Sequence, residues 1–275
     1  MKRTLASIIF LLFLSSCGFR QAYYFSPFNG NTPNYHTTPL QIDSIKNATY
    51  GSILLGGGEA NDRLTDNVFI YRSSVYRSHA REKYQFYYGG NITLGNYQVR
   101  KYDTLDIVNS LRNGKIINEN AGNKFWGGLG LNAGVNYTIP FRTRHELRIG
   151  TESSYHYEFG NYLEFRKKIP DSAVTLIHRQ GHFITLGLYT ELAFKIRNGS
   201  IGFKIAIGTP LGKNYSNADG VRSEKGILPF GYFSPTFQYT NKRWTGFVQL
   251  TGAAKAFYSQ IGGSYRLASA TKKQK

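Results

Sequence analysis

Residues 125–159 read FWGGLGLNAGVNYTIPFRTRHELRIGTESSYHYEF and decide the fold. On both sides of a turn at 141–144, apolar side chains alternate with small or polar ones. Strand side chains point alternately to two faces, so each arm has one apolar and one polar face. Each arm exceeds the ~5–6 residues of a usual strand and suffices for the ~9–11 of a strand that crosses a bilayer. The hairpin therefore predicts part of a membrane barrel with a polar interior.

The same alternation recurs along the chain. We predict ten antiparallel strands, near 49–56, 67–76, 84–95, 125–139, 145–159, 183–196, 200–208, 229–240, 243–252 and 257–267. The connections alternate in length, with long ones at 96–124, 160–182 and 209–228. Outer-membrane barrels keep short turns in the periplasm and long loops outside. The fold class is therefore an all-β transmembrane antiparallel β-barrel of about ten strands. The first two strands fit the pattern least well, because Arg72 shares a face with Val68 and Ile70. If these two strands lie outside the wall, the barrel has eight strands.

The polar faces of these strands carry charges that would project into the barrel. They are Arg148, Glu152, Glu191, Lys195, Lys204 and Arg266. An unpaired buried charge is costly, so we expect these side chains to pair with one another. A barrel of ten strands is also much narrower than the 16-stranded porins that hold a water channel. We therefore predict a lumen closed by salt bridges rather than an open pore.

The first residues have the pattern of an export signal. Lys2 and Arg3 precede an apolar run at 8–14, and Cys17, the single cysteine, ends the segment. We expect residues 1–16 to be a cleaved signal peptide. The run Leu14-Ser15-Ser16-Cys17 resembles a bacterial lipobox. That resemblance implies acylation of Cys17, with a lipid chain as anchor. Gly18 at the next position resembles the sorting signal of lipoproteins that are released to the outer membrane.

Residues 17–47 do not have the pattern of a barrel wall, because Pro27, Pro33 and Pro39 would each interrupt a strand ladder. We expect a Pro- and Tyr-rich periplasmic segment that packs on another part of the protein. Its string YYFSPFNGN, residues 23–31, is similar to the opening of uncharacterised lipoproteins common in Bacteroidota. The barrel would then occupy 48–268, and 269–275 would form a basic tail. The phase of the short turns predicts that the N- and C-termini both lie in the periplasm.

The composition limits which classes of binding partner are expected. The formal net charge is +18. Basic proteins often bind nucleic acid, but an exported lipoprotein does not normally meet any, so we expect none. Outer-membrane lipid and anionic glycolipid are the expected partners, with a surface ligand at the long loops. The expected location is the outer membrane of the cell, by a lipid anchor.

One group of side chains has the elements of a hydrolase triad. Ser154, His156 and Glu158 share a face of one predicted strand. Neighbours on one face of a strand lie about 6.5–7 Å apart, whereas a triad requires contacts of ~3 Å. We therefore expect them to line the lumen without catalysing a reaction. Outer-membrane lipid deacylases and palmitoyltransferases use similar groups, so a lipid-modifying hydrolase remains an alternative.

Other candidate sites are weaker. His178 and His182 lie in a predicted solvated loop without further ligands at metal spacing, so we predict no metal site. The sequence has no motif for a cofactor: 56–58 is a run of glycines but lacks the Lys-Ser/Thr of a phosphate loop. The sequence thus predicts a non-catalytic envelope-structural or surface-binding protein. A second alternative is a soluble lipid-anchored carrier of lipocalin type, whose apolar face would point inward.

Overall fold

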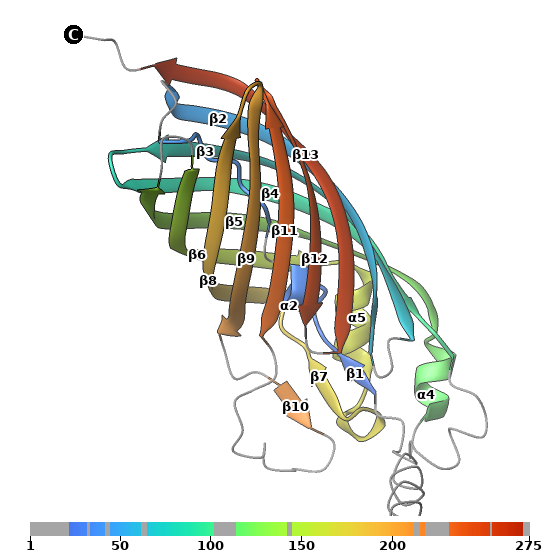
Figure 1. Cartoon of the computed structure of the whole chain (residues 1–275). Coiled ribbons are helices and arrows are strands. Elements are labelled where there is room, and N and C mark those ends of the chain that lie inside the picture. The colour runs from blue at the N-terminus through green and yellow to red at the C-terminus, as the bar shows by residue number, and fades with distance from the viewer. Residues whose placement is uncertain are drawn as a thin grey trace, which may run out of the picture.

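Ten antiparallel strands form a closed barrel in a computed structural model of the chain (Figure 1). The structure describes residues 22–31, 34–41, 45–61, 65–101, 114–141, 145–211, 215–217, 231–253 and 255–271. The strands of the wall are β2 (Ile45–Ala60), β3 (Asp66–Ala80), β4 (Tyr84–Val99), β5 (Gly122–Phe141), β6 (His145–Phe159), β8 (His182–Ile196), β9 (Gly199–Leu211), β11 (Tyr232–Asn241), β12 (Trp244–Ala253) and β13 (Ala256–Thr271). Strand β13 pairs with β2 and closes the barrel.

The prediction of ten strands is confirmed, including the first two, which the sequence defines least clearly. Strands β2 and β3 are longer than predicted, and both lie in the wall between β13 and β4. In β3 the side chains of Val68, Ile70 and Arg72 are all buried, whereas Phe69 and Val75 are 54% and 57% exposed. The face that Arg72 shares with the two apolar residues is therefore the inner one, and the outer face is apolar as a membrane requires.

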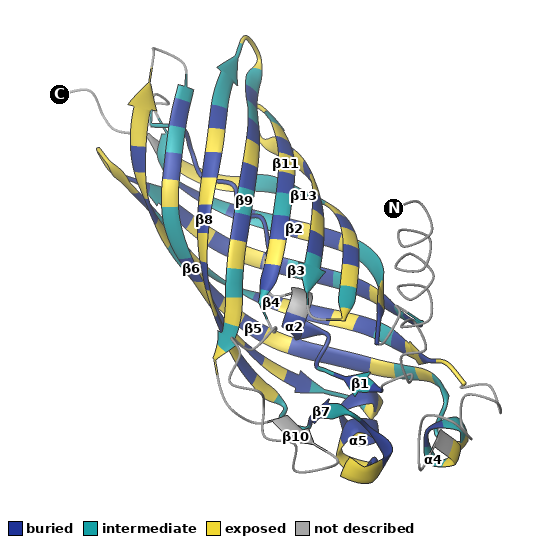
Figure 2. Ribbon diagram, turned by 60° about the horizontal axis from the view of Figure 1, so that its bottom comes forward, coloured by how far each residue is buried: buried dark blue, intermediate teal, exposed yellow. Residues whose placement is uncertain are grey.

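The wall is apolar outside and polar inside, as the hairpin predicts. Along each strand buried and exposed residues alternate (Figure 2). Leu131 and Leu188 are 65% and 61% exposed on the outside, whereas Glu146, Arg148 and His156 are buried inside. Exposed leucines would be unfavourable in water but are suited to lipid. The alternative of a lipocalin-type carrier is wrong, because it requires the opposite arrangement.

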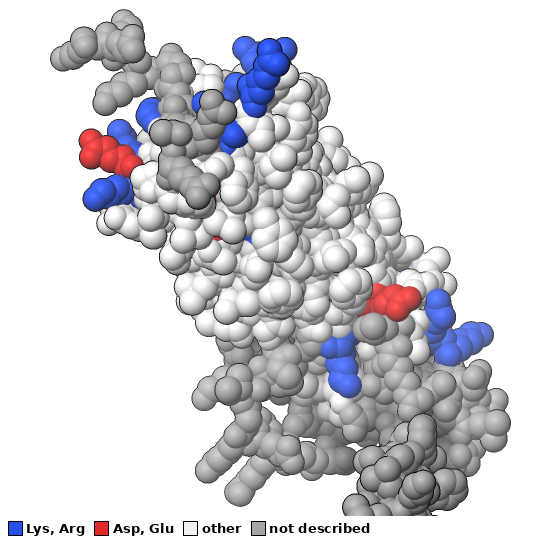
Figure 3. Space-filling view, in the orientation of Figure 1, with Lys and Arg blue, Asp and Glu red and all other residues white. Residues whose placement is uncertain are grey.

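Aromatic side chains border this apolar surface at both ends. Near the short turns, Tyr84 packs on Tyr137 and Trp244 on Tyr265, with ring centroids 5.3 and 4.6 Å apart. Near the long loops, Phe125, Tyr155 and Tyr157 are exposed. Most of the Lys and Arg side chains on the visible face lie near its two ends (Figure 3). Aromatic girdles around an apolar band are typical of transmembrane barrels.

The N-terminal segment runs inside the barrel. Its residues meet the inner face of β6 in reverse order: Ser26 bonds Glu158, Thr38 bonds Arg148, and Gln41 bonds Glu146. Residues 22–31 and 34–41 therefore descend through the lumen from the long-loop end to the short-turn end, where β2 begins. We call these residues the lumen segment. It includes the short helix α2 (Phe28–Asn31).

This path corrects the predicted positions of the chain ends. The backbone carbonyl of Ala22 accepts hydrogen bonds from the amides of Thr175 and Leu176, in the connection between β6 and β8, so Ala22 lies at the long-loop end. Thr271 pairs with Ile45 at the opposite end. The prediction that both ends lie on the short-turn side is therefore wrong for the described residues. Residues 22–31 and 34–41 belong to the segment predicted to be periplasmic and to pack on another part of the protein, and they pack inside the barrel. The strands of the wall extend from Ile45 to Thr271.

The second long connection folds into a cap at the long-loop end. It contains α5 (Asn161–Lys168), a 3₁₀ turn η2 (Asp171–Ala173) and β7 (Leu176–His178). Strand β7 lies between β1 (Tyr23–Tyr24) of the lumen segment and β10 (Tyr215–Asn217). A further short helix, α4 (Gly114–Glu119), precedes β5. Among the described helices, none has the length and apolar character needed to cross a bilayer.

Candidate functional site: the lumen and its basic cavity

The long-loop end of the lumen is filled by aromatic rings. Phe28 of the lumen segment stacks on His156 at 4.4 Å and meets Trp126 edge-on at 5.3 Å. Gly128 faces Phe28, and a Cβ there would lie 2.4 Å from the phenyl ring. The glycine therefore leaves the space that Phe28 occupies. Tyr97 and Tyr162 stack nearby at 3.9 Å and join the wall to α5 of the cap.

The three side chains of the predicted triad each contact other groups. Ser154 Oγ lies 2.5 Å from Thr185 Oγ1, and His156 stacks on Phe28. Glu158 accepts a 2.5 Å hydrogen bond from Ser26 Oγ and pairs with Arg166. They line the lumen on one face of β6, and the described hydrogen bonds do not connect them as a nucleophile, a base and an orienting acid.

Arg166 of the cap is linked to the lumen segment through Glu158, which also bonds Ser26. From α5, its guanidinium reaches Glu158 inside the barrel and donates to the backbone carbonyl of His178 on β7 at 2.5 Å. His178 is buried here, so the prediction of a solvated loop is wrong at this residue. Burial, then the charge of Arg166 and then His182, lower the pKa of His178 to about 3. The imidazole is therefore neutral at physiological pH.

The middle of the lumen holds one buried ion pair. Lys204 Nζ lies 2.5 Å from Glu152 Oε2, and the hydroxyls of Tyr87 and Tyr232 donate to the same carboxylate at 3.1 and 3.3 Å. His36 of the lumen segment stacks on Tyr87 at 4.3 Å. A buried ion pair with these extra hydrogen bonds has its charges compensated.

The short-turn end contains a second ion cluster. Arg148 lies between Glu146 and Glu191, with a nitrogen–oxygen distance of 3.1 Å to each. The same guanidinium donates to Thr38 Oγ1 at 2.7 Å, and Tyr35 donates to Glu191 at 3.0 Å. Two residues of the lumen segment are thus bound directly to an ion cluster of the wall.

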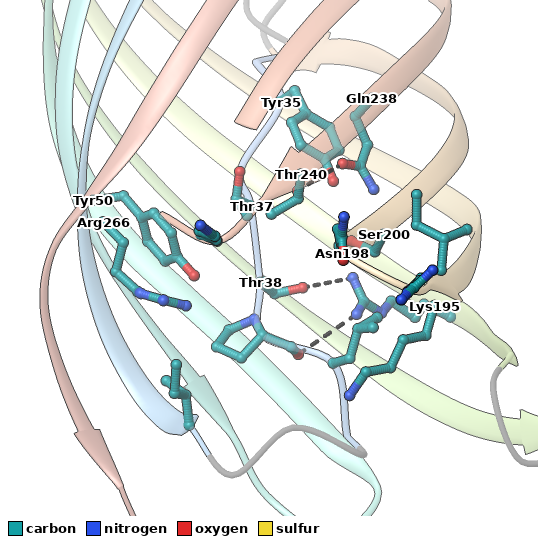
Figure 4. Close-up of a pocket in the computed structure, with 18 residues that line it drawn as sticks. Tyr35, Thr37, Thr38, Tyr50, Lys195, Asn198, Ser200, Gln238, Thr240 and Arg266 are labelled. Carbon is teal, nitrogen blue, oxygen red and sulfur yellow. Dashed lines mark hydrogen bonds between the residues drawn. The ribbon is translucent and has the colours of Figure 1, made fainter. Parts of the chain in front are cut away.

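Beside this cluster the lumen widens into a cavity of about 680 Å³. One wall is the lumen segment from Tyr35 to Leu40, and the other walls are strand ends and two short turns (Figure 4). The basic residues at its surface are Arg148, Lys195, Arg197, Lys242 and Arg266, and no acidic residue lines it among those that the structure describes. The cavity therefore has a strongly basic lining.

Two residues predicted for the lumen charge network, Lys195 and Arg266, line this cavity instead of joining the ion pairs in the middle of the barrel. They approach from opposite walls in Figure 4. Arg266 lies next to Tyr50. Sequence reasoning missed the part played by Tyr35 and Thr38. The density of aromatic residues in 17–47 was the available signal, since it indicated packing but not the surface involved.

Two further predictions concern metal binding and the acylation of Cys17. Within the described ranges, no three His, Cys, Asp or Glu side chains are placed together as metal ligands. Cys17, the predicted acylation site, lies outside the described residues.

The sequence matches no protein-family model and no curated protein. Among solved structures, the chain is similar to the transport unit of the autotransporter AIDA-I from Escherichia coli, with a TM-score of 0.44, 8% identity and coverage of 80% of this chain and 90% of that one. It is also similar to the beta domain of the Bordetella autotransporter BrkA (TM-score 0.39, 8% identity, 81% and 100% coverage) and to the porin KdgM (TM-score 0.29, 7% identity, 80% and 99% coverage). At these identities the likeness concerns the barrel and identifies no ligand.

Proposed function

We propose that this protein is a closed, lipid-anchored outer-membrane barrel that presents a folded cap at the cell surface. Its role is non-catalytic: the cap and long loops bind a surface ligand or support the envelope. The observation that carries this proposal is the lumen segment, which fills the barrel and joins the cap through β1. A barrel filled in this way holds no open channel, so its external end is available as a binding platform.

The outer membrane is the compartment that suits this wall. Its strands are antiparallel and apolar outside, and the four turns at one end are short. In outer-membrane barrels such turns face the periplasm. The cap then lies outside the cell, and Thr271 lies at the periplasmic end.

The path of the lumen segment supports an outer-leaflet position for the proposed lipid anchor. Cys17 precedes Ala22 by five residues, a stretch that spans at most roughly 17 Å. A strand of 15 residues such as β6 is about 50 Å long, or about 38 Å along the axis of a barrel tilted by ~40°. An acyl group on Cys17 therefore reaches the leaflet on the cap side. The proposal changes the sequence-based expectation accordingly, from a periplasmic anchor to one in the outer leaflet.

Two epitope tags on intact cells test this topology. One is inserted after Gln21 and the other is appended to Lys275. We expect an antibody to label the first tag on intact cells and the second only after permeabilisation. Heat-modifiable gel mobility verifies that both tagged proteins contain a folded barrel. The reverse labelling pattern would overturn the proposal.

Metabolic labelling with a palmitate analogue tests the anchor separately. We expect the label on the wild-type protein and its loss in Cys17→Ser. Retention of label in that variant would place the acyl group elsewhere.

The non-catalytic role is tested at His156. Because Phe28 covers this imidazole and no described hydrogen bond joins it to Ser154, we expect His156→Ala to leave the lipid A and phospholipid profile unchanged in a mass assay. A change in acylation that also appears in Ser154→Ala would instead support the hydrolase alternative.

A further inference from the structure

We propose that the basic cavity at the short-turn end binds a phosphate-bearing small molecule. The site consists of Lys195, Arg197, Lys242 and Arg266, with Arg148 at its inner end. These residues come from strands and turns that are far apart in the sequence, and the closed barrel brings them together around one space. This site lies at the end opposite the cap and is separate from the surface role proposed above.

The charge of the lining favours an anion. Arg148 pairs with Glu146 and Glu191, so this cluster has one net negative charge, but its carboxylates do not line the cavity. Lys195 and Arg266 on facing walls, together with Arg197 and Lys242 at the turns, add four cations that outnumber this single negative charge. No described lining residue supplies a carboxylate at the cavity surface. A cleft lined by positive charges and bounded by low-dielectric walls concentrates the electrostatic field and attracts anions.

The donors favour phosphate over a single carboxylate. A phosphate ester carries about −1.5 to −2 charges at neutral pH and three strong acceptor oxygens. Guanidinium groups bind such oxygens bidentately, and a lysine adds a point charge. Arg266 lies beside Tyr50 at the cavity wall. Neutral donors from Ser200 and Gln238 complete the lining.

The space fits the body of a small organic ester. A volume of about 680 Å³ lies in the range of roughly 300–1,000 Å³ typical of small-molecule sites. Tyr35, Tyr50 and Pro39 provide apolar surface beside the cations. Both a phospholipid headgroup and a soluble phosphate ester share this chemistry. Because the lumen segment forms one wall of the cavity, binding of a ligand there should also stabilise the lumen segment in its position.

Isothermal titration calorimetry of the full-length protein in maltoside micelles at low salt tests the proposal, with glycerol 3-phosphate as the probe. We expect saturable binding to the wild-type protein, and affinity weaker by about tenfold or more in the double variant Lys195→Gln/Arg266→Gln, because two charge-assisted contacts are lost. The matched control is Arg81→Gln/Lys83→Gln. It removes the same charge at the same end of the barrel, outside the cavity. We expect this control to bind like the wild type.

Three results would overturn the proposal: no binding by the wild-type protein, equal loss in both double variants, or equal affinity for glycerol 3-phosphate and uncharged glycerol. Heat-modifiable mobility shows that each variant retains a folded barrel, so that loss of binding is not loss of fold. Repeating the titration in nanodiscs that contain phosphatidylglycerol identifies the source. Suppressed binding there assigns the site to a lipid headgroup, and unchanged binding assigns it to a soluble ester; both support the site.

Discussion

The two ends of the lumen are built from the same strands but are filled differently. At the cap end, Phe28 is packed against Trp126 and His156 without space between the rings. At the short-turn end, the lumen segment is bound by hydrogen bonds to Arg148 and borders a cavity of about 680 Å³. The comparison indicates that the cap end seals the barrel and that the other end stays accessible to small molecules.

The lumen segment contacts the inner wall at both ends of the barrel, so its removal should have the largest effect. Deleting residues 23–40 leaves the ten strands of the wall intact and removes the groups that fill them. We expect stepwise ion conductance in planar bilayers, where the wild-type protein is silent. Heat-modifiable mobility identifies preparations whose barrel is folded. A folded but silent deletion variant would show that the wall side chains alone close the lumen.

Substitution of Arg148 tests the packing of the short-turn end. Arg148→Ala leaves the carboxylates of Glu146 and Glu191 buried without their cation, and breaking a buried pair in this way costs about 3–5 kcal/mol. We expect a correspondingly lower free energy of unfolding in urea, measured in micelles. Adding Glu146→Gln and Glu191→Gln should restore much of the loss. A triple variant as unstable as Arg148→Ala would mean that packing, rather than charge, holds this end.

Substitution of Phe28 tests the packing of the cap end. Phe28→Ala removes a fully buried ring and should reduce the free energy of unfolding by about 3–5 kcal/mol. The matched truncation at the other end is Leu40→Ala, which borders the existing cavity. We expect a smaller loss there, because the space left by the side chain joins one that is already present. Equal losses would contradict the difference between the ends.

A smaller effect is expected from pH at the cap. The pKa of His178 is lowered to about 3 by burial, whereas an unfolded histidine has a pKa of about 6.5. Unfolding of the cap therefore takes up a proton between these values, so its stability is fully present above pH 6.5 and falls as the pH decreases towards 3. Hydrogen–deuterium exchange in 161–178, corrected for the intrinsic rate, should increase over this range. The increase should be absent in His178→Phe, and an unchanged pH dependence there would assign it to another group.

The alternation of side chains was sufficient to predict the barrel. Leu131 and Ile149 face outward, and Asn136 and Arg148 face inward, because the period of a strand is two and is independent of what surrounds it. The alternation of short and long connections predicted which strand ends share a side of the barrel, since antiparallel neighbours follow one another in the sequence.

The inner face was predicted only in part. The sequence shows that Glu152, Lys204 and Arg148 lie inside, but not their partners. Glu152 and Lys204 are 52 positions apart, and their contact depends on the register across β6, β8 and β9. The cavity has the same origin, because Lys195 and Arg266 face each other only once the sheet has closed.

The sequence by itself determined the wall, since local periodicity fixes which face of each strand is apolar. The tertiary structure alone decided what fills the wall and where the N-terminal residues lie. Residues 22–41 have prolines and aromatic residues but no period that specifies a partner. Their position depends on long-range contacts such as Ser26 with Glu158, 132 residues away, and on the space that Gly128 leaves for Phe28. Such contacts exist only in the closed barrel, so no local pattern encodes them.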